Sequence, residues 1–274
     1  MRSLLICTTI LGLGSLAVAS VLVDLTAAGG GTATLTGGTT TGTILDATSA
    51  PTTVGTGVID SFVRLQTNGN SELGYNTDGN PANDEKNGNF THSLLFSSLD
   101  TATKPGYVTF LLDINQLDNS PLLSLDAIQF YAAASPSLTS VGTPSPATLF
   151  YNLQDVTSAV CAAGGVCNNA SANTHDAITL NYTNNKGSGN GFDMFLYVPT
   201  SVFAGVNTAA TPYFYLYSQF GALGGSLTTN DGFEEWARFS STGQSVPEPI
   251  SSTLVGTGLI ALFFVGRRRI ANKA

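Results

Sequence analysis

The sequence has few of the residues on which most catalytic sites depend. It contains two histidines, His92 and His175, among 274 residues, too few for a His-rich metal site or a metalloprotease. No G-x-S-x-G motif lies between residues 20 and 246, and no glycine-rich stretch carries the Lys-Ser/Thr pair of a phosphate-binding loop. We therefore predict that the protein is not an enzyme and has no catalytic residues. A carboxylate pair for glycoside hydrolysis is still allowed among 18 acidic residues, so a secreted hydrolase is kept as a third hypothesis.

Basic residues are also scarce. Between Ser20 and Val246 there are five, against seventeen acidic residues, which gives this part of the chain a net charge of −12. Nucleic-acid binding needs a basic patch, so no nucleic-acid partner is expected. Thr, Ser, Asn and Gly are plentiful instead. This composition suits a secreted protein with an uncharged polar surface, and the partners left open are cations, neutral polymers such as polysaccharide, or other proteins.

The N-terminus has the pattern of a secretory signal peptide, residues 1–19. Arg2 gives a short positive region, an apolar run follows from Leu4 to Val18, and Ala17-Val18-Ala19 fits the cleavage pattern. The mature protein would begin at Ser20. Cys7 lies within the apolar run and would leave with the signal peptide.

The C-terminus, residues 247–274, combines three features. Residues 250–266 carry no charge over 17 positions, which is the lower limit for a transmembrane helix, and two glycines weaken it further. A basic tail follows, which should stay cytoplasmic. The triplet that precedes the apolar stretch and the basic tail consist of Pro247, Glu248, Pro249, Arg267, Arg268 and Arg269.

This order of triplet, apolar helix and arginines resembles the PEP-CTERM sorting signal of bacterial surface proteins. The resemblance covers about a tenth of the chain. It implies processing by an exosortase-type membrane enzyme, transient anchoring in the inner membrane, and a final place on the cell surface or in the extracellular matrix. An ordinary tail anchor is the alternative. Such a signal determines where a protein is sorted, so it leaves open the function of residues 20–246.

Period-2 alternation of apolar and polar residues recurs between Gly-, Asn- and Pro-rich turns, whereas helical periodicity is nearly absent. The pattern predicts an all-β fold, a single β-sandwich ectodomain of jelly-roll-like type over residues 20–246. One short helix is expected at Thr200–Gly205. The expected strands are Val58–Gln66, Tyr107–Ile114, Leu123–Tyr131, Thr148–Leu153, Ile178–Tyr182, Phe192–Val198 and Tyr213–Ser218.

Residues 27–57 differ from the rest. They are rich in Thr and Gly, contain few large apolar residues, and carry a single charge, Asp46. We expect short strands packed loosely on the edge of the domain. The alternative is a flexible spacer.

Cys161 and Cys167 are the two cysteines that remain after loss of the signal peptide. A close pair in an exported protein indicates a disulfide, and the glycines between them allow the loop to close. No second pair or nearby histidine completes a tetrahedral metal site, although metal binding or free thiols remain alternatives.

The segment from Asn76 to Asn89 gathers hard oxygen donors on a loop bent by Gly and Pro. Such donors suit calcium, but the spacing fails the EF-hand pattern because Asn89 stands where its glutamate is needed. A solvated turn loop is the alternative, and no other cofactor is expected. The candidate calcium ligands are Asp78, Asn80, Asp84 and Glu85.

Tyr213, Tyr215 and Tyr217 share one face of a predicted strand and could stack against sugar rings. Trp236, the only tryptophan, is a fourth candidate for stacking. Ordinary packing of these rings is the alternative. Our leading hypothesis is a structural or interaction role on the cell surface or in the matrix. The alternative is a carbohydrate-binding module.

Overall fold

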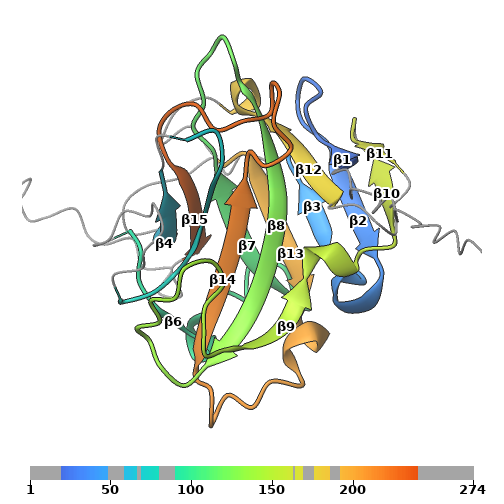
Figure 1. The fold of residues 1–274 in the computed structure, drawn as a ribbon. Helices are drawn as coiled ribbons and strands as arrows, with labels where there is room; N and C mark the ends of the chain where they lie inside the picture. The colour runs from blue at the N-terminus through green and yellow to red at the C-terminus, as the bar shows by residue number, and fades with distance from the viewer. Residues whose placement is uncertain are drawn as a thin grey trace, which may run out of the picture.

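The computed structural model of the chain describes residues 20–48, 59–66, 69–79, 90–162, 164–168, 176–185 and 192–239. These residues form two β-sheets that pack face to face, with β14 and β8 in front of β7 and β13 in Figure 1. Regular helices in this part of the chain are short turns of 3-10 type: η1 Gly38–Thr40, η2 Phe96–Ser98, η3 Leu153–Asp155, η4 Tyr182–Asn184 and η5 Thr200–Phe203. The described part of the chain is therefore an all-β sandwich.

Sheet A has eight strands, with the order β11-β1-β12-β8-β14-β5; β6 also pairs with β14 and β9 with β8. β1 and β12 run parallel, and the other pairs in the sheet are antiparallel. The strands are β1 Ser20–Asp24, β5 Glu72–Tyr75, β6 Leu94–Leu95, β8 Leu122–Ala133, β9 Thr148–Asn152, β11 Val166–Cys167, β12 Asp176–Asn181 and β14 Tyr213–Phe220.

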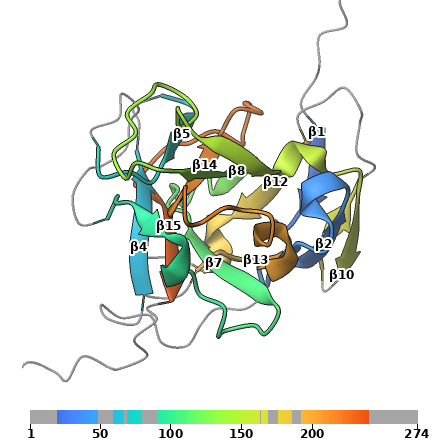
Figure 2. The same cartoon turned by 90° about the horizontal axis from the view of Figure 1, so that it is seen from below.

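Sheet B has seven strands in the order β10-β2-β3-β13-β7-β15-β4, and all its pairs are antiparallel. The view from below in Figure 2 separates it from sheet A. Its strands are β2 Thr32–Thr36, β3 Ile44–Asp46, β4 Ile59–Leu65, β7 Tyr107–Asp113, β10 Ser158–Ala162, β13 Met194–Pro199 and β15 Glu234–Phe239.

The core lies between the sheets and is built from one side of each strand. β14 sends Phe214, Leu216 and Phe220 inward, all 0% exposed. From sheet B, Phe110 stacks on Phe214 with ring centroids 5.4 Å apart. Trp236 of β15 is also fully buried there, and its indole N–H donates to the Ser218 hydroxyl at 3.1 Å. Burial of these rings is the main stabilisation of the sandwich.

All seven strands predicted from alternation are confirmed, with small shifts at their ends. The predicted helix at Thr200–Gly205 is the 3-10 turn η5. β5 was missed because Glu72–Tyr75 is short and interrupted by Gly74, and β1 was missed because it adjoins the apolar run of the predicted signal peptide.

The prediction of loose packing for residues 27–57 is wrong where the structure describes them, up to residue 48. β2 and β3 form a hairpin between β10 and β13, and they bury Ala33, Leu35 and Leu45. The few apolar residues suffice because Ala33, Leu35 and Leu45 all belong to the main core. Thr40 and Thr43 are buried too, and Thr40 donates its hydroxyl to the carbonyl of Gly37.

Cys161 and Cys167 form the predicted disulfide. Cys161 belongs to β10 at the edge of sheet B, and Cys167 to β11 at the edge of sheet A. The bond therefore joins the two sheets along one side of the sandwich.

Removal of this bond should lower stability modestly. The closed loop is short, so the chain-entropy model gives a loss of about 2 kcal/mol in unfolding free energy for Cys161→Ser/Cys167→Ser. Denaturant unfolding of the double variant and of the reduced wild type measures it. Equal midpoints for oxidised and reduced wild type would contradict the prediction.

The predicted signal peptide 1–19 and the predicted sorting segment 247–274, with its apolar stretch 250–266, lie outside the described residues. Within the described ranges, no helix has the length and apolar character needed to span a membrane.

Candidate functional site

The outer face of sheet A carries a cluster of tyrosines. Tyr213, Tyr215 and Tyr217 point to this face, as alternation predicts, and pack with Tyr75 and Tyr131. The loop over residues 134–147, between β8 and β9, folds over part of the cluster. The hydroxyl of Tyr215 donates to the carbonyl of Ser135 at 2.7 Å, and that of Tyr75 donates to the carbonyl of Ser140 at 2.7 Å.

The covering loop contradicts the expectation that these rings form an exposed platform for sugar rings. Tyr215 and Trp236 are both 0% exposed, the first under the loop and the second between the sheets. The interpretation of these two rings as exposed stacking surfaces is therefore wrong. Tyr213 is half-buried and lies outside the hollow described next. Of the four candidate rings, Tyr217 is the one that lines this hollow.

Beside the covering loop, the outer face of sheet A contains a hollow of about 330 Å³. We call it the tyrosine-face hollow. Its residues come from β8, β14, η3, the covering loop and the turn after β14, and they are mostly uncharged and polar. They are Asp126, Ala127, Gln129, Thr143, Gln154, Tyr217, Gln219 and Ala222.

A β-bulge shapes the floor of the hollow. Gln219 pairs with Ala127 and Phe220 with Leu125, so Asp126 is an extra residue on β8. The bulge brings the consecutive residues Asp126 and Ala127 to the same hollow. The Asp126 carboxylate accepts N–H bonds from Ala222 at 2.7 Å and from Leu223 at 3.2 Å, which fixes the turn after β14.

Two glutamines of the hollow are held in place. Gln154 donates to the carbonyl of Asp126 at 2.8 Å, and its Oε1 accepts the N–H of Asp176 at 3.0 Å. Gln129 accepts the hydroxyl of Tyr131 at 2.6 Å and donates to Asn152. These residues form rigid walls, which favours a preformed site.

Two further groups are available to a ligand. The Tyr217 hydroxyl and the Gln219 amide make no hydrogen bond within the part of the chain that the structure describes, although both residues line the hollow. Burial raises the pKa of Tyr217 to about 12, so its hydroxyl remains a neutral donor over the physiological range. Tyr217 is 7% exposed, so the hollow offers a neutral polar ligand a hydroxyl and an amide rather than an open ring face.

Sequence reasoning found Tyr217 but missed the glutamines. Gln219 continues the row Tyr213–Tyr217 with the same period of 2, so alternation could have placed it on the same face. Gln129 alternates with Tyr131 in the same way. Asp126 could not be found, because nothing in the sequence marks the bulge that turns it outward.

The candidate calcium ligands are only partly described. Asn80, Asp84 and Glu85 lie outside the described residues. Asp78 accepts hydrogen bonds from the N–H and the hydroxyl of Ser93, at 2.7 and 2.8 Å, so its carboxylate ties together two segments that are 15 residues apart. No group of three or more Asp, Glu, His or Cys residues within the described ranges is arranged to hold a metal.

Carboxylate pairs exist, but they are buried. Glu234 of sheet B is 1% exposed and hydrogen-bonds to Glu72 of sheet A, and burial together with the neighbouring Glu72 raises its pKa well above the usual range. Gln116 donates to Glu234 at 2.6 Å. Two carboxyls in contact cannot both ionise, so this pair shares a proton. It ties the two sheets together and does not line the hollow.

Asp113 of β7 and Asp193, beside β13, form a second pair in sheet B. Burial, followed by the charge of Glu235, raises the pKa of Asp113 to about 7, while Arg64 opposes the shift. Burial also raises the pKa of Asp193, which is 4% exposed and accepts the N–H of Ile114 at 2.8 Å. The two carboxyls hydrogen-bond to each other.

This pair predicts a fall in stability with rising pH. The folded-state pKa of Asp113 lies above its ordinary value of 3.8. Its contribution to the free energy of unfolding is therefore complete below pH 3.8 and is lost as pH rises to about 7. Asp113→Asn keeps a carbonyl oxygen that accepts from the protonated Asp193 carboxyl, but it cannot ionise. We expect the variant to melt at a higher temperature than wild type at pH 8, with a smaller gain at pH 4. Melting curves that shift equally at both pH values would contradict this assignment.

In comparisons with known proteins, no family model, curated protein or solved structure matches the chain.

Proposed function

We propose that this protein is exported to the cell surface or extracellular matrix and acts there by binding a neutral polysaccharide, without catalysis. The observation that carries the binding role is the tyrosine-face hollow, which offers the free Tyr217 hydroxyl and the free Gln219 amide between fixed glutamines. At about 330 Å³, it falls at the small end of ligand pockets and suits a single sugar ring.

Charge supports a neutral ligand. Asp126 is the only ionisable carboxylate among the described residues that line the hollow, and backbone N–H groups engage both its oxygens. The net charge of −12 over residues 20–246 disfavours polyanions. A glycosidase needs two carboxyls beside the scissile bond, and the lining supplies one. Binding therefore fits the hollow better than hydrolysis does.

Export rests on the two ends of the sequence. Residues 1–19 support a cleavable signal peptide, and Pro247-Glu248-Pro249 with the apolar stretch and three arginines supports exosortase-type sorting. The disulfide agrees with an oxidising compartment.

We also assign the sandwich to the jelly-roll type. The order β5-β14-β8-β12 in sheet A and β4-β15-β7-β13 in sheet B supports this assignment, because eight strands are shared by two four-stranded antiparallel groups. β1, β2, β3, β10 and β11 extend the sheets on the side of the disulfide.

Glycan binding is tested with Tyr217→Phe, which removes the hydroxyl and keeps the ring. An array of neutral glycans identifies a ligand, and titration calorimetry should then show affinity about 2- to 10-fold lower in the variant, the usual value of one neutral hydrogen bond. Tyr213→Phe is the matched control, since it lies on the same face of β14 outside the hollow. Absence of binding to every neutral glycan would overturn the proposal, as would equal effects of the two substitutions.

Sorting is tested separately by mass spectrometry of protein recovered from the cell surface or the medium. We expect an N-terminus at Ser20, a C-terminus within or near Pro247-Glu248-Pro249, and no peptide that contains Arg267, because processing removes the basic tail. Recovery of the intact arginine cluster from surface material would contradict exosortase-type processing.

A further inference from the structure

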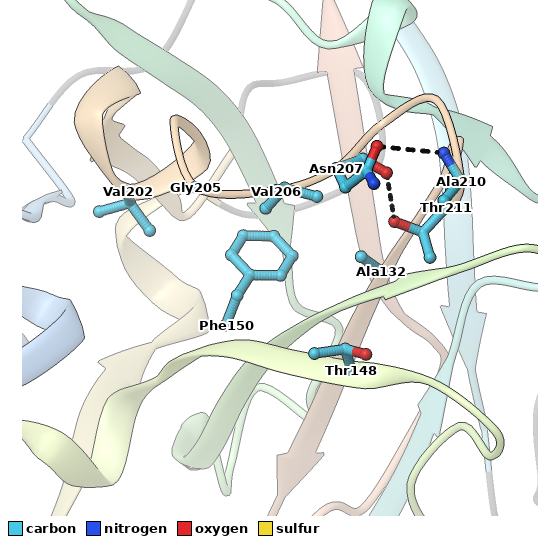
Figure 3. A pocket seen from close by; sticks show the side chains of 9 residues that line it. All are labelled: Ala132, Thr148, Phe150, Val202, Gly205, Val206, Asn207, Ala210 and Thr211. Atoms are coloured by element: carbon cyan, nitrogen blue, oxygen red, sulfur yellow. Dashed lines mark hydrogen bonds between the residues drawn. The ribbon is translucent and has the colours of Figure 1, made fainter.

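A second and larger pocket opens at the end of the sandwich where β9 meets the segment that follows η5 (Figure 3). Its volume is about 490 Å³, and none of the described residues that line it carries a charge. We call it the Phe150 pocket. Its lining consists of Ala132, Thr148, Phe150, Val202, Gly205, Val206, Asn207, Ala210 and Thr211.

The floor of this pocket is a rigid aromatic ring. Phe150 contacts the rings of Phe203, Phe96 and Phe130, with centroids 5.5, 5.8 and 6.1 Å away. The register of β8 and β9 shifts between Tyr151 and Leu149, so Phe150 is a bulge residue. Figure 3 shows its ring below the loop that carries Val206, with Thr148 on the other side.

The opposite wall is fixed by Asn207. Its carbonyl accepts the N–H and hydroxyl of Thr211, at 2.9 and 2.8 Å, and its Oδ1 accepts the N–H of Ala210 at 3.3 Å. The side-chain Nδ2 group makes no hydrogen bond within the described ranges, and the same holds for the Thr148 hydroxyl. A neutral donor and a hydroxyl therefore flank the ring.

We propose that the Phe150 pocket binds a neutral pyranose residue, so that each molecule holds two glycan segments and bridges polysaccharide chains. A pyranose has an apolar C–H face to lie on Phe150 and rim hydroxyls for Asn207 and Thr148. This inference rests on the proposed glycan-binding function and extends it from one site to two.

The two sites are separate. Gln129 of β8 lines the tyrosine-face hollow and points, like Tyr131, to the outer face of the sheet. Ala132 of the same strand lines the Phe150 pocket and points, like Phe130, to the opposite face. One sugar ring cannot contact both. Two sites on one rigid body raise avidity for a repeating polymer without new contacts.

Two substitutions test the pocket without touching the hollow. Gly205→Trp fills it, because a Cβ at Gly205 has no heavy atom within 4 Å. Asn207→Asp keeps an oxygen for Ala210 but replaces the free donor with an acceptor. Gly106→Trp is the control, since Gly106 is equally open and lies outside the pocket, although its φ of +87° adds strain. Melting curves check that each variant folds.

The probes are neutral tetrasaccharides of glucose, mannose, galactose or xylose, titrated into the full mature protein. We expect two sites per molecule in wild type and one in Gly205→Trp, and at least a 5-fold weaker second site in Asn207→Asp. Light scattering with the matching polysaccharide should show cross-linking that Gly205→Trp abolishes.

Other outcomes separate the two proposals. A single site weakened by Tyr217→Phe and unmoved by Gly205→Trp would overturn this inference and leave the proposed function standing. A single site lost in Gly205→Trp and unmoved by Tyr217→Phe would overturn both bridging and the role of the hollow. Binding of N-acetyltyrosine amide with no sugar binding would make the pocket a protein-docking site, and both proposals would fall.

Discussion

The central strand β14 sets the main constraint on this molecule, because it carries large rings on both faces. Phe214, Leu216 and Phe220 fill the space between the sheets, while Tyr213, Tyr215 and Tyr217 face outward. Aromatic rings on both faces must be kept from water. The second sheet covers one face, and the loop over residues 134–147 covers part of the other. The tyrosine-face hollow lies beside this cover, so the candidate site follows from the way one strand is buried on both sides.

Different interactions join the two sheets on the two sides of the sandwich. The disulfide joins the edge strands β10 and β11. Near the opposite side, Glu72 of the edge strand β5 hydrogen-bonds to Glu234 of β15. A covalent bond holds regardless of pH, whereas the carboxyl pair holds only while it keeps its proton.

Much of the fold could be predicted from alternation, and less of the site. The row Tyr213, Tyr215, Tyr217 was correctly placed on one face, but alternation cannot say whether that face meets solvent or a loop. Burial of Tyr215 depends on the covering loop, whose Ser135 carbonyl accepts its hydroxyl from 80 residues away in the sequence. The bulge at Asp126 and the contact between Glu72 and Glu234 likewise depend on strand pairing across the whole chain. The disulfide could be predicted from the sequence because its two cysteines are close together in it.

The net charge of the chain and the side chains that line its pockets influence a ligand at different distances. Excess acidic charge over residues 20–246 creates a field that reaches about 8–10 Å at physiological ionic strength and repels polyanions before contact. The described lining of the Phe150 pocket is uncharged, and in the hollow backbone N–H groups engage both oxygens of the one carboxylate, Asp126, so selection depends mainly on shape and hydrogen bonds. Such bonds replace bonds to water and yield little net free energy each. A polymer that repeats the same residue overcomes this weakness, because the first contact raises the local concentration for the second. Neutral, weak and repeated contacts are therefore consistent with a protein that organises a hydrated polysaccharide layer and lets it remain deformable.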